Sequence, residues 1–400
     1  MSNRNGVWSL SAHLQAIGDT NWLMPPGVPT SVSATAGNAQ ATVSFTAPTF
    51  AGVPGTITGF KVTSSEGETA TGSSSPITVT GLTNDTAHTF TVQAQNATGF
   101  SGASAASSSV TPSNPDTGVF FGAGDSTSNV IQYISISSTG NASDWGDLLQ
   151  AQKSKGALGN ATRGLAYGGT GTTYGSNVIE YITFATTGNS QDFGDLIQSS
   201  GSGKNIGMAG TASDTRGMIM GGQATNEISY VTISSTGNAT DFGDFASSSR
   251  SYGGAGSNGT RAVFGGEANM CEYVTIASTG NATNFGNLSS QRNSMGAGCS
   301  STRILWMGGN DSDDRTIDYV TTASTGNATD FGNLVSAAFE NGACSNKTRA
   351  VCAHGFNGSA FTNIMSYVTM ASTGDSQDFG DLLATGSQRA GASDCHGGLS

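Results

Sequence analysis

The chain has 400 residues, of which only 10% are charged, and its formal net charge is −12. This charge would repel nucleic-acid phosphates, and no apolar run reaches the length of a membrane-spanning helix, so we expect neither nucleic-acid binding nor membrane insertion. The 58 glycines against 8 prolines are typical of many short strands joined by tight turns. The five cysteines are an odd number, which favours buried free thiols in a reducing compartment over a disulfide framework.

An apolar stripe marks the first segment, residues 1–26. Three of its aliphatic residues recur at the spacing of one helical face, and two Trp residues flank them. The residues concerned are Trp8, Leu10, Leu14, Ile17 and Trp22. A helix this short is unstable alone, so we expect the segment to act as an anchor that docks on its own chain or on a partner. It also lacks the apolar run of a signal peptide, so export by the general secretory route is not expected.

Residues 27–112 alternate polar and apolar side chains in runs such as "QATVSFTAP" and "AHTFTVQAQN", which predicts β-strands. The stretch resembles a fibronectin type III domain. The resemblance is carried by Pro29, Phe45, Phe60, Val62, Leu82, residues 89–96, Gly99 and Ser101. Two positions depart from the family. Phe45 stands where the family usually has Trp, and His88 stands where a corner Tyr usually hydrogen-bonds back to the chain.

Residues 113–400 repeat one pattern about every 47 residues. The Gly of "TTG" or "STG" falls at Gly140, Gly188, Gly237, Gly280, Gly326 and Gly374. Each repeat holds four strand-like runs, and the second runs begin near Gly118, Gly164, Gly217, Ala262, Ile304 and Ala350. A period of this length with four strands per unit predicts a six-bladed β-propeller.

The repeat resembles a kelch repeat, in which an aliphatic strand ends in Gly-Gly and is followed by a Tyr strand and an aromatic strand. The Gly pairs begin at Gly168, Gly221, Gly265 and Gly308. The Tyr residues are Tyr133, Tyr181, Tyr230, Tyr273, Tyr319 and Tyr367, and the aromatic residues are Trp145, Phe193, Phe242, Phe285, Phe331 and Phe379. The C-terminal run matches a first strand, whereas residues 118–124 match a second strand that no first strand precedes. We therefore expect Ser387–Gly398 to pair with Gly118–Gly124 and close the ring.

Charged and polar residues recur with the repeat. Asp precedes the fourth-strand aromatic at Asp144, Asp192, Asp241, Asp330 and Asp378. Asn replaces it at Asn284, which favours turn capping over a carboxylate pair or a calcium loop. Lys153, Lys204, Arg250, Arg292 and Arg389 precede first strands, and Arg163, Arg216, Arg261, Arg303 and Arg349 begin second strands. We expect both series to pair with the Asp residues, with a grip on an anionic ligand as the alternative.

The loops after the Gly pairs vary most, and variable loops on one face of a rigid ring are where a propeller usually recognises its ligand. The candidate binding residues are Tyr174, Asp311, Asp313, Asp314, Phe356 and Phe361. The aromatic residues would stack on sugars, and the acidic loop is interpreted as solvated rather than calcium-bound. The four histidines have no metal-ligand spacing, although His354 and His396 both lie near the expected seam. We predict no catalytic residue, metal or cofactor.

The opening "NRNGVWSLSAHLQAIGDTNWL" and the "STGNATDFGDL" repeats together resemble virion proteins of tailed bacteriophages, especially those that infect marine cyanobacteria. The resemblance implies a non-enzymatic tail-fibre or appendage component, assembled in the host cytoplasm. It would contact other virion proteins through residues 1–26, bind a host-surface glycan or receptor, and form a homo-oligomer in the particle. Two alternatives stay open. A bacterial adhesin or lectin would need an export signal, and a glycan-active enzyme would need acids clustered on one face.

Overall fold

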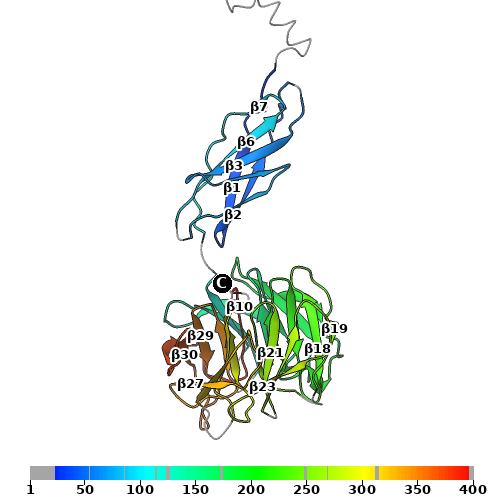
Figure 1. Ribbon diagram of the computed structural model, residues 1–400, viewed down its shortest axis with the longest axis vertical. Helices are drawn as coiled ribbons and strands as arrows, with labels where there is room; N and C mark the ends of the chain where they lie inside the picture. The colour runs from blue at the N-terminus through cyan, green and yellow to red at the C-terminus, as the bar shows by residue number, and fades with distance from the viewer. Residues whose placement is uncertain are drawn as a thin grey trace, which may run out of the picture. The chain divides into compact units, whose positions relative to one another are not determined.

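The computed structural model describes residues 23–395 with short gaps. The gaps are residues 54, 85, 113–114, 123–126, 172–173, 247–249, 268 and 311–314. The chain divides into two compact units, Met1–Asn114 and Pro115–Ser400 (Figure 1). The described part is all-β apart from one 3-10 helix, η1 (Gly203–Asn205). The anchor residues from Trp8 to Trp22 lie outside the described residues, so the helix expected there stays a prediction.

The first unit contains two antiparallel sheets. One has the order β1 (Thr30–Gly37), β2 (Gln40–Thr46), β5 (Ile77–Thr80), and the other β4 (Thr69–Gly72), β3 (Gly59–Ser64), β6 (Phe90–Asn96), β7 (Gly99–Phe100). Alternate residues of β2, β3 and β6 are buried, which places one face of each strand in a shared core. Val43, Val62, Phe90 and Val92 are fully buried there.

The segment that follows β7 covers the free edge of β6 with a ladder of serines. Ser101, Ser104 and Ser107 each donate their backbone amide to a carbonyl of β6. Each also accepts a β6 amide on its hydroxyl oxygen, at 2.9 to 3.1 Å. The run ends where His88 and Val110 exchange backbone hydrogen bonds, both at 2.9 Å. A sheet edge that would otherwise be open is thereby paired, and the backbone of His88 is fixed.

In its described part the second unit contains six antiparallel sheets, here numbered 1 to 6 in chain order. Sheet 1 has the order β13 (Thr170–Gly171), β10 (Ser143–Lys153), β9 (Ser128–Ser135), β8 (Thr117–Phe121), β32 (Ala390–Ser393). Sheet 2 has the order β11 (Gly156–Gly159), β12 (Arg163–Tyr167), β14 (Val178–Thr183), β15 (Gln191–Asp195). Sheet 3 has the order β16 (Ala209–Ala212), β17 (Arg216–Met220), β18 (Glu227–Thr232), β19 (Thr240–Asp244). Sheet 4 has the order β20 (Gly254–Ser257), β21 (Arg261–Gly266), β22 (Met270–Thr275), β23 (Thr283–Asn287). Sheets 5 and 6 are β24 (Gly296–Cys299), β25 (Arg303–Met307), β26 (Thr316–Thr321), β27 (Thr329–Asn333); and β28 (Gly342–Ser345), β29 (Arg349–Ala353), β30 (Ile364–Thr369), β31 (Gln377–Asp381).

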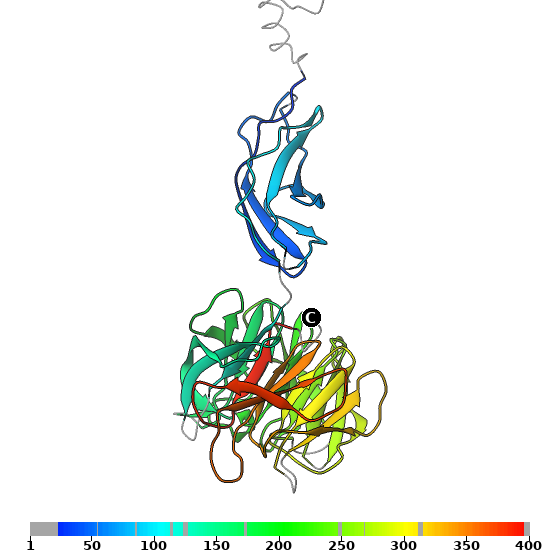
Figure 2. The same ribbon diagram turned by 90° about the vertical axis from the view of Figure 1, so that its left-hand side faces the viewer.

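Sheet 1 joins the two ends of this unit. Ala390 lies opposite Phe121 and Ser393 lies opposite Gly118 in an antiparallel pair between β32 and β8. Figure 2 shows red strands from the end of the chain near teal strands from the start of this unit. The pairing that the sequence predicts for the C-terminal run is therefore present over the four described residues of β32.

The recurring Gly-Asn turn joins each sheet to the one before it. In sheet 2, the amide of Gly188 donates to the carbonyl of Trp145 at 2.9 Å, and Asn189 Oδ1 accepts from the amide of Asp147 at 3.0 Å. The same glycine contact recurs at Gly237, Gly280, Gly326, Gly374 and Gly140, and Gly140 of sheet 1 binds Phe379 of sheet 6. A Cβ added at Gly146 would lie 2.5 Å from the Gly188 backbone. The fourth strand therefore needs a glycine here for the turn of the next sheet to pack against it. The repeated sequence "TGN…FG" thus encodes contacts between sheets.

The cations that begin the second strands bind aromatic rings and carbonyls rather than acids. Arg163 lies 4.6 Å from the ring centre of Tyr181, and its Nη1 donates to the carbonyl of Ile233 in the next sheet at 2.8 Å. The other members of this series make the equivalent pair of contacts: Arg216, Arg261, Arg303 and Arg349. The predicted pairing with Asp144 and its equivalents is wrong, because those side chains are exposed while the planar guanidinium fits a Tyr face. Capping of strand amides is performed by Asn189 and its equivalents instead.

Three cations near the first strands form buried ion pairs, but not with the predicted partners. The pairs are Lys155–Glu180 at 2.8 Å, Arg250–Glu272 at 2.5 Å and Arg292–Asp318 at 3.0 Å. Their carboxylates come from the third strands, where one position of the repeat holds an acid in these sheets. The paired lysine is Lys155 and not Lys153, and Arg389 binds carbonyls of residues 384 and 386. Arg250, Arg292 and Arg389 of the first series and all five arginines of the second are therefore used within the fold.

Candidate binding site at the mouth of the second unit

Six residues, one before the first strand of each sheet, share a left-handed backbone conformation. They are Ser154 (φ 57°), Gly207 (66°), Tyr252 (53°), Ser294 (59°), Glu340 (58°) and Gln388 (55°), and we call them the rim. Five of them are not glycine, and a left-handed residue with a Cβ costs about 1–2 kcal/mol. Such strain persists where the surrounding structure demands it, and it is concentrated at functional sites.

Backbone hydrogen bonds connect the rim residues in one cycle. Each amide donates to the carbonyl of the equivalent residue in the preceding sheet, at distances of 2.5 to 3.2 Å. The amide of Ser154, the first in the chain, donates to the carbonyl of Gln388, the last, at 3.2 Å. The left-handed turn is what presents amide and carbonyl to neighbours on both sides. The rim is therefore a rigid frame in which each residue fixes the next.

The rim surrounds a cavity of about 100 Å³. Its wall continues into the first strands, which supply small residues such as Gly156, Gly210 and Ala297. Lys155 and Arg389 also line it, but the Lys155 ammonium is paired with Glu180 and the Arg389 guanidinium is bound to carbonyls. Among the described lining residues, Glu340 is the one carboxylate.

Side-chain hydrogen bonds order the polar groups of the rim. Ser154 Oγ donates to Gln388 Oε1 at 2.6 Å, and Gln388 Nε2 donates to Glu340 Oε1 at 2.8 Å. Tyr252 lines the cavity two rim positions from Ser154, and burial raises the pKa of its hydroxyl. Gly207 lies between them, and a Cβ there would meet the Tyr252 ring at 2.9 Å. The chain of hydrogen bonds runs from the Ser154 hydroxyl to the Glu340 carboxylate, so the rim presents hydroxyl, amide and acid groups in fixed positions.

Of the predicted binding residues, Phe356 and Phe361 lie in a loop that pairs with the segment carrying the rim residue Glu340. Phe356 and Phe339, the neighbour of Glu340, exchange backbone hydrogen bonds, and the Phe356 ring contacts those of Phe339 and Phe361 at 5.2 Å between centroids. All three rings are half-buried. Tyr174 is 57% exposed, and its hydroxyl lies 3.2 Å from Gln223 Oε1. The remaining candidates lie outside the described residues: Asp311, Asp313 and Asp314. Phe356 and Phe361 therefore form one aromatic cluster, while Tyr174 stands separately.

Sequence reasoning missed the rim. Its residues do not resemble one another and are not typical left-handed residues, so single positions gave no signal. A comparison between the repeats does contain a signal. One position varies within an otherwise similar run of small residues, and it is occupied by Ser154, Tyr252, Ser294, Glu340 and Gln388. A position that varies inside a constant frame is where a repeat protein places recognition.

The buried titratable groups of the second unit are structural. His354 lies between the hydroxyls of Ser366 at 2.7 Å and Ser336 at 3.2 Å, and burial lowers its pKa to about 4. His396 lies outside the described residues, so the expected meeting with His354 stays a prediction. All five cysteines are free and buried, which confirms the expectation of buried thiols. Burial raises the pKa of Cys299 to about 11 and that of Cys271 to about 12, which makes both poor nucleophiles at neutral pH.

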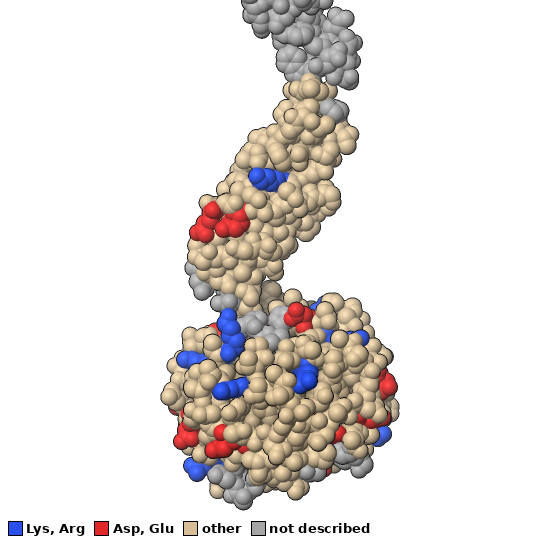
Figure 3. All heavy atoms as spheres, viewed as in Figure 1, with Lys and Arg blue, Asp and Glu red and all other residues tan. Residues whose placement is uncertain are grey.

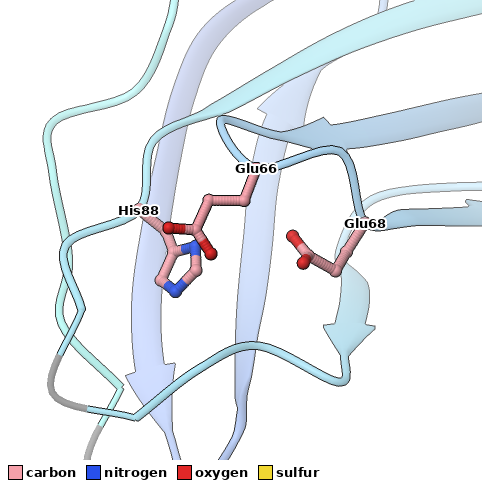
Figure 4. Close-up of side chains that lie close together, drawn as sticks. All are labelled: Glu66, Glu68 and His88. Atoms are coloured by element: carbon pink, nitrogen blue, oxygen red, sulfur yellow. The ribbon is translucent and has the colours of Figure 1, made fainter.

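A second group of chemically competent side chains lies in the first unit. Glu66, Glu68 and His88 place one ligand atom each within 4.8 Å of one another (Figure 4). His88 is fully buried, Glu68 is half-buried and Glu66 is exposed. Among the described residues, this is a group of the kind that holds a metal ion.

The geometry of the first unit agrees with the comparison to protein families. Residues 26–110 match the fibronectin type III domain family. This stretch is a fibronectin type III domain. Within the fibronectin domain, Phe45 replaces the usual Trp and packs on Phe60 at 4.8 Å between ring centres. His88 replaces the corner Tyr, and its Nε2 lies 3.1 Å from the carbonyl of Thr83, so the bond back to the chain is kept.

No curated protein sequence matches the chain. The described residues contain no helix with the length and apolar character needed to cross a membrane. On the face shown in Figure 3, Lys and Arg residues are separated by uncharged side chains over the second unit, without a continuous basic patch.

Proposed function

We propose that the second unit is a six-bladed, kelch-like β-propeller whose blades are sheets 1 to 6. Two cyclic sets of contacts and a series of five stacked arginines support this. The rim hydrogen bonds return from Ser154 to Gln388, the Gly-Asn turns return from Gly140 to Phe379, and the stacked arginines return from Arg349 to the carbonyl of Ser137 at 2.6 Å. The pairing of β32 with β8 fits a ring fastened by its two ends.

We further propose that the protein is a non-enzymatic appendage component of a tailed-phage virion that binds a host-surface glycan at the rim. The observation that carries the binding part is the ordered chain from Ser154 through Gln388 to Glu340 around a cavity of about 100 Å³. Hydroxyl, amide and carboxylate groups in fixed positions suit a sugar, whose hydroxyls both donate and accept hydrogen bonds. The aromatic cluster of Phe339, Phe356 and Phe361 would supply an apolar neighbour for a sugar ring.

The composition of the cavity favours binding over glycan hydrolysis. Hydrolysis of a glycosidic bond uses two carboxyl groups that face each other across the substrate. Among the described lining residues Glu340 is the one carboxylate, and it is already bound to Gln388. The virion part of the proposal rests on the sequence resemblance and on the apolar stripe of residues 1–26.

Antibody labelling of purified phage particles tests the virion assignment, together with mass spectrometry of the same particles. We expect the chain among the structural proteins and the label on an appendage. The purified full chain should also adsorb to host cells and compete with particle attachment. Detection on the surface of uninfected bacteria would favour the adhesin alternative, and absence from purified particles would refute the virion assignment.

A further inference from the structure

We propose that Glu66, Glu68 and His88 of the fibronectin domain form a binding site for a zinc-like divalent metal ion. The proposal is independent of the function proposed for the second unit. It rests on the juxtaposition of two carboxylates with a buried imidazole, whose ligand atoms lie within 4.8 Å of one another (Figure 4).

The hydrogen bonding of His88 leaves one ring nitrogen available to a metal. Nε2 lies 3.1 Å from the carbonyl oxygen of Thr83, which can only accept, so Nε2 carries a proton. In the neutral ring, Nδ1 then presents a lone pair. Nδ1 is buried and has no hydrogen-bond partner among the described residues. Metal-binding histidines commonly donate their other ring nitrogen to a backbone carbonyl in this way.

The two carboxylates face this lone pair from the turn between β3 and β4. Figure 4 shows the Glu66 carboxylate beside the ring and the Glu68 carboxylate opposite it. Ser64 orients the turn, since its hydroxyl donates to Glu68 Oε2 and accepts the amides of Glu66, Gly67 and Glu68 at 3.1 to 3.2 Å. The two carboxylates and the Nδ1 lone pair repel one another where they meet, and the Ser64 hydroxyl satisfies Glu68 Oε2 alone. A bound cation removes this repulsion, and a second proton on His88 is the competing solution.

The donor set selects the class of metal. One imidazole nitrogen with two carboxylate oxygens is typical of zinc and related transition metals, whereas calcium and magnesium prefer oxygen ligands alone. Three protein ligands leave further positions for water. No metal-ligand spacing is visible in the sequence, because His88 and the glutamates belong to separate segments that only the folded domain brings together. An ion bound here would link the turn that carries Glu66 and Glu68 to His88, which lies just before β6. It would stabilise the folded domain because the unfolded chain lacks the site.

Calorimetric titration of the metal-free full chain with zinc chloride at pH 7.5 tests the proposal. We expect saturable binding of one ion at this site and an increase in the melting temperature of the fibronectin domain. Glu66→Gln should weaken binding at least about tenfold without unfolding the protein, because Glu66 is exposed. Asp241→Asn, an exposed acid in the second unit, is the matched control and should bind as the unmodified chain does. Zinc binding that is absent, or equal in the chain and in Glu66→Gln, would overturn the proposal.

Nitrogen NMR of the histidine side chains separates the metal from the competing proton. The chain has four histidines, so selective labelling gives few signals, and His88→Gln assigns the one of interest. We expect zinc to move the Nδ1 signal of His88. If His88 were doubly protonated and its signals did not respond to zinc, a proton would supply the positive charge beside the carboxylates. The metal site would then be rejected.

Discussion

The amide of Ser154 donates to the carbonyl of Gln388 at 3.2 Å, although the two residues are 234 positions apart in the chain. The bond completes the cycle of six rim residues, and the side chains of the same two residues are also hydrogen-bonded, at 2.6 Å. Each rim residue is hydrogen-bonded to the rim residues of the two neighbouring sheets. The loss of one sheet would therefore leave two rim residues without one of their partners. The C-terminal strand that follows Gln388 is therefore central to the second unit.

Deletion of residues 387–400 should destabilise the second unit severely. It removes β32, leaves the edge of β8 unpaired, and exposes Phe120 and Phe121, which are fully buried. We expect the melting temperature of this unit to fall by about 10 °C or more, with aggregation on warming. Scanning calorimetry and light scattering measure both. A shorter deletion, of residues 396–400, keeps β32 and serves as the control. If a chain of residues 1–386 stayed monomeric and melted like the full chain, the pairing of β32 with β8 would not be what holds the second unit together.

Phe242→Ala should cost about 3–5 kcal/mol of unfolding free energy, as the truncation of a core aromatic does. Phe242 is 2% exposed, and its ring packs edge-on against Tyr230 at 6.0 Å between ring centres. Leu383→Ala is the matched control, because Leu383 is 50% exposed and should change stability by less than about 0.5 kcal/mol. Urea unfolding of the second unit gives both values. Equal effects of the two substitutions would mean that Phe242 is not part of the core.

The stability of the second unit should fall between pH 6.5 and pH 4 in part because of His354. Burial lowers its pKa to about 4, below the usual 6.5, so over this range the unfolded chain takes up a proton that the folded chain does not. His354 causes no loss of stability above pH 6.5. The loss grows to about 2–3 kcal/mol near pH 4.5 and becomes constant below pH 4. His354→Gln should remove this part of the slope. Urea unfolding at several pH values compares the two proteins, and identical slopes would show that His354 is not buried as a neutral ring.

Removal of residues 1–22 should leave the fold intact but abolish incorporation into particles. The truncation starts at residue 23 because Met24 exchanges backbone hydrogen bonds with Val53 and accepts one from Asn96, so it belongs to the fibronectin domain. We expect unchanged circular dichroism and a melting temperature within about 2 °C of the full chain. Complementation of a phage that lacks the gene measures incorporation. Normal incorporation would place the anchor elsewhere, and unfolding would make residues 1–22 structural.

The repeats made much of the second unit predictable from the sequence. Six copies of one pattern allowed the second strands near Gly118 and Ala350 to be placed by analogy with their neighbours, and the C-terminal run found its partner in the same way. The role of the Gly-Asn turn was not visible, since the contact of Gly188 with Trp145 lies between repeats rather than within one. The same limitation explains the wrong partners given to Arg163 and its equivalents.

The candidate sites depended on features that the sequence does not state. The conformation of Ser154 or Glu340 is imposed by the cycle of which they are part, and neither residue type favours it. The Glu66–Glu68–His88 group forms only when the turn after β3 meets the segment before β6. By contrast, the burial of Cys299, Cys344 and Cys395 was predictable because they fall just before or in turns of related repeats.

Binding of the full chain to an array of bacterial surface glycans, compared with the Glu340→Gln variant, tests the proposed role of the rim most directly. Glu340 accepts from Gln388 within the cavity wall, and the substitution removes the charge while it keeps the shape of the side chain. Asp241→Asn, outside the cavity, is the control. We expect the unmodified chain and the control to bind the same glycans, and Glu340→Gln to bind them at least about tenfold more weakly because it loses a charge-assisted hydrogen bond. Equal binding by Glu340→Gln, or no glycan binding by the unmodified chain, would contradict the assignment of the rim as the binding site.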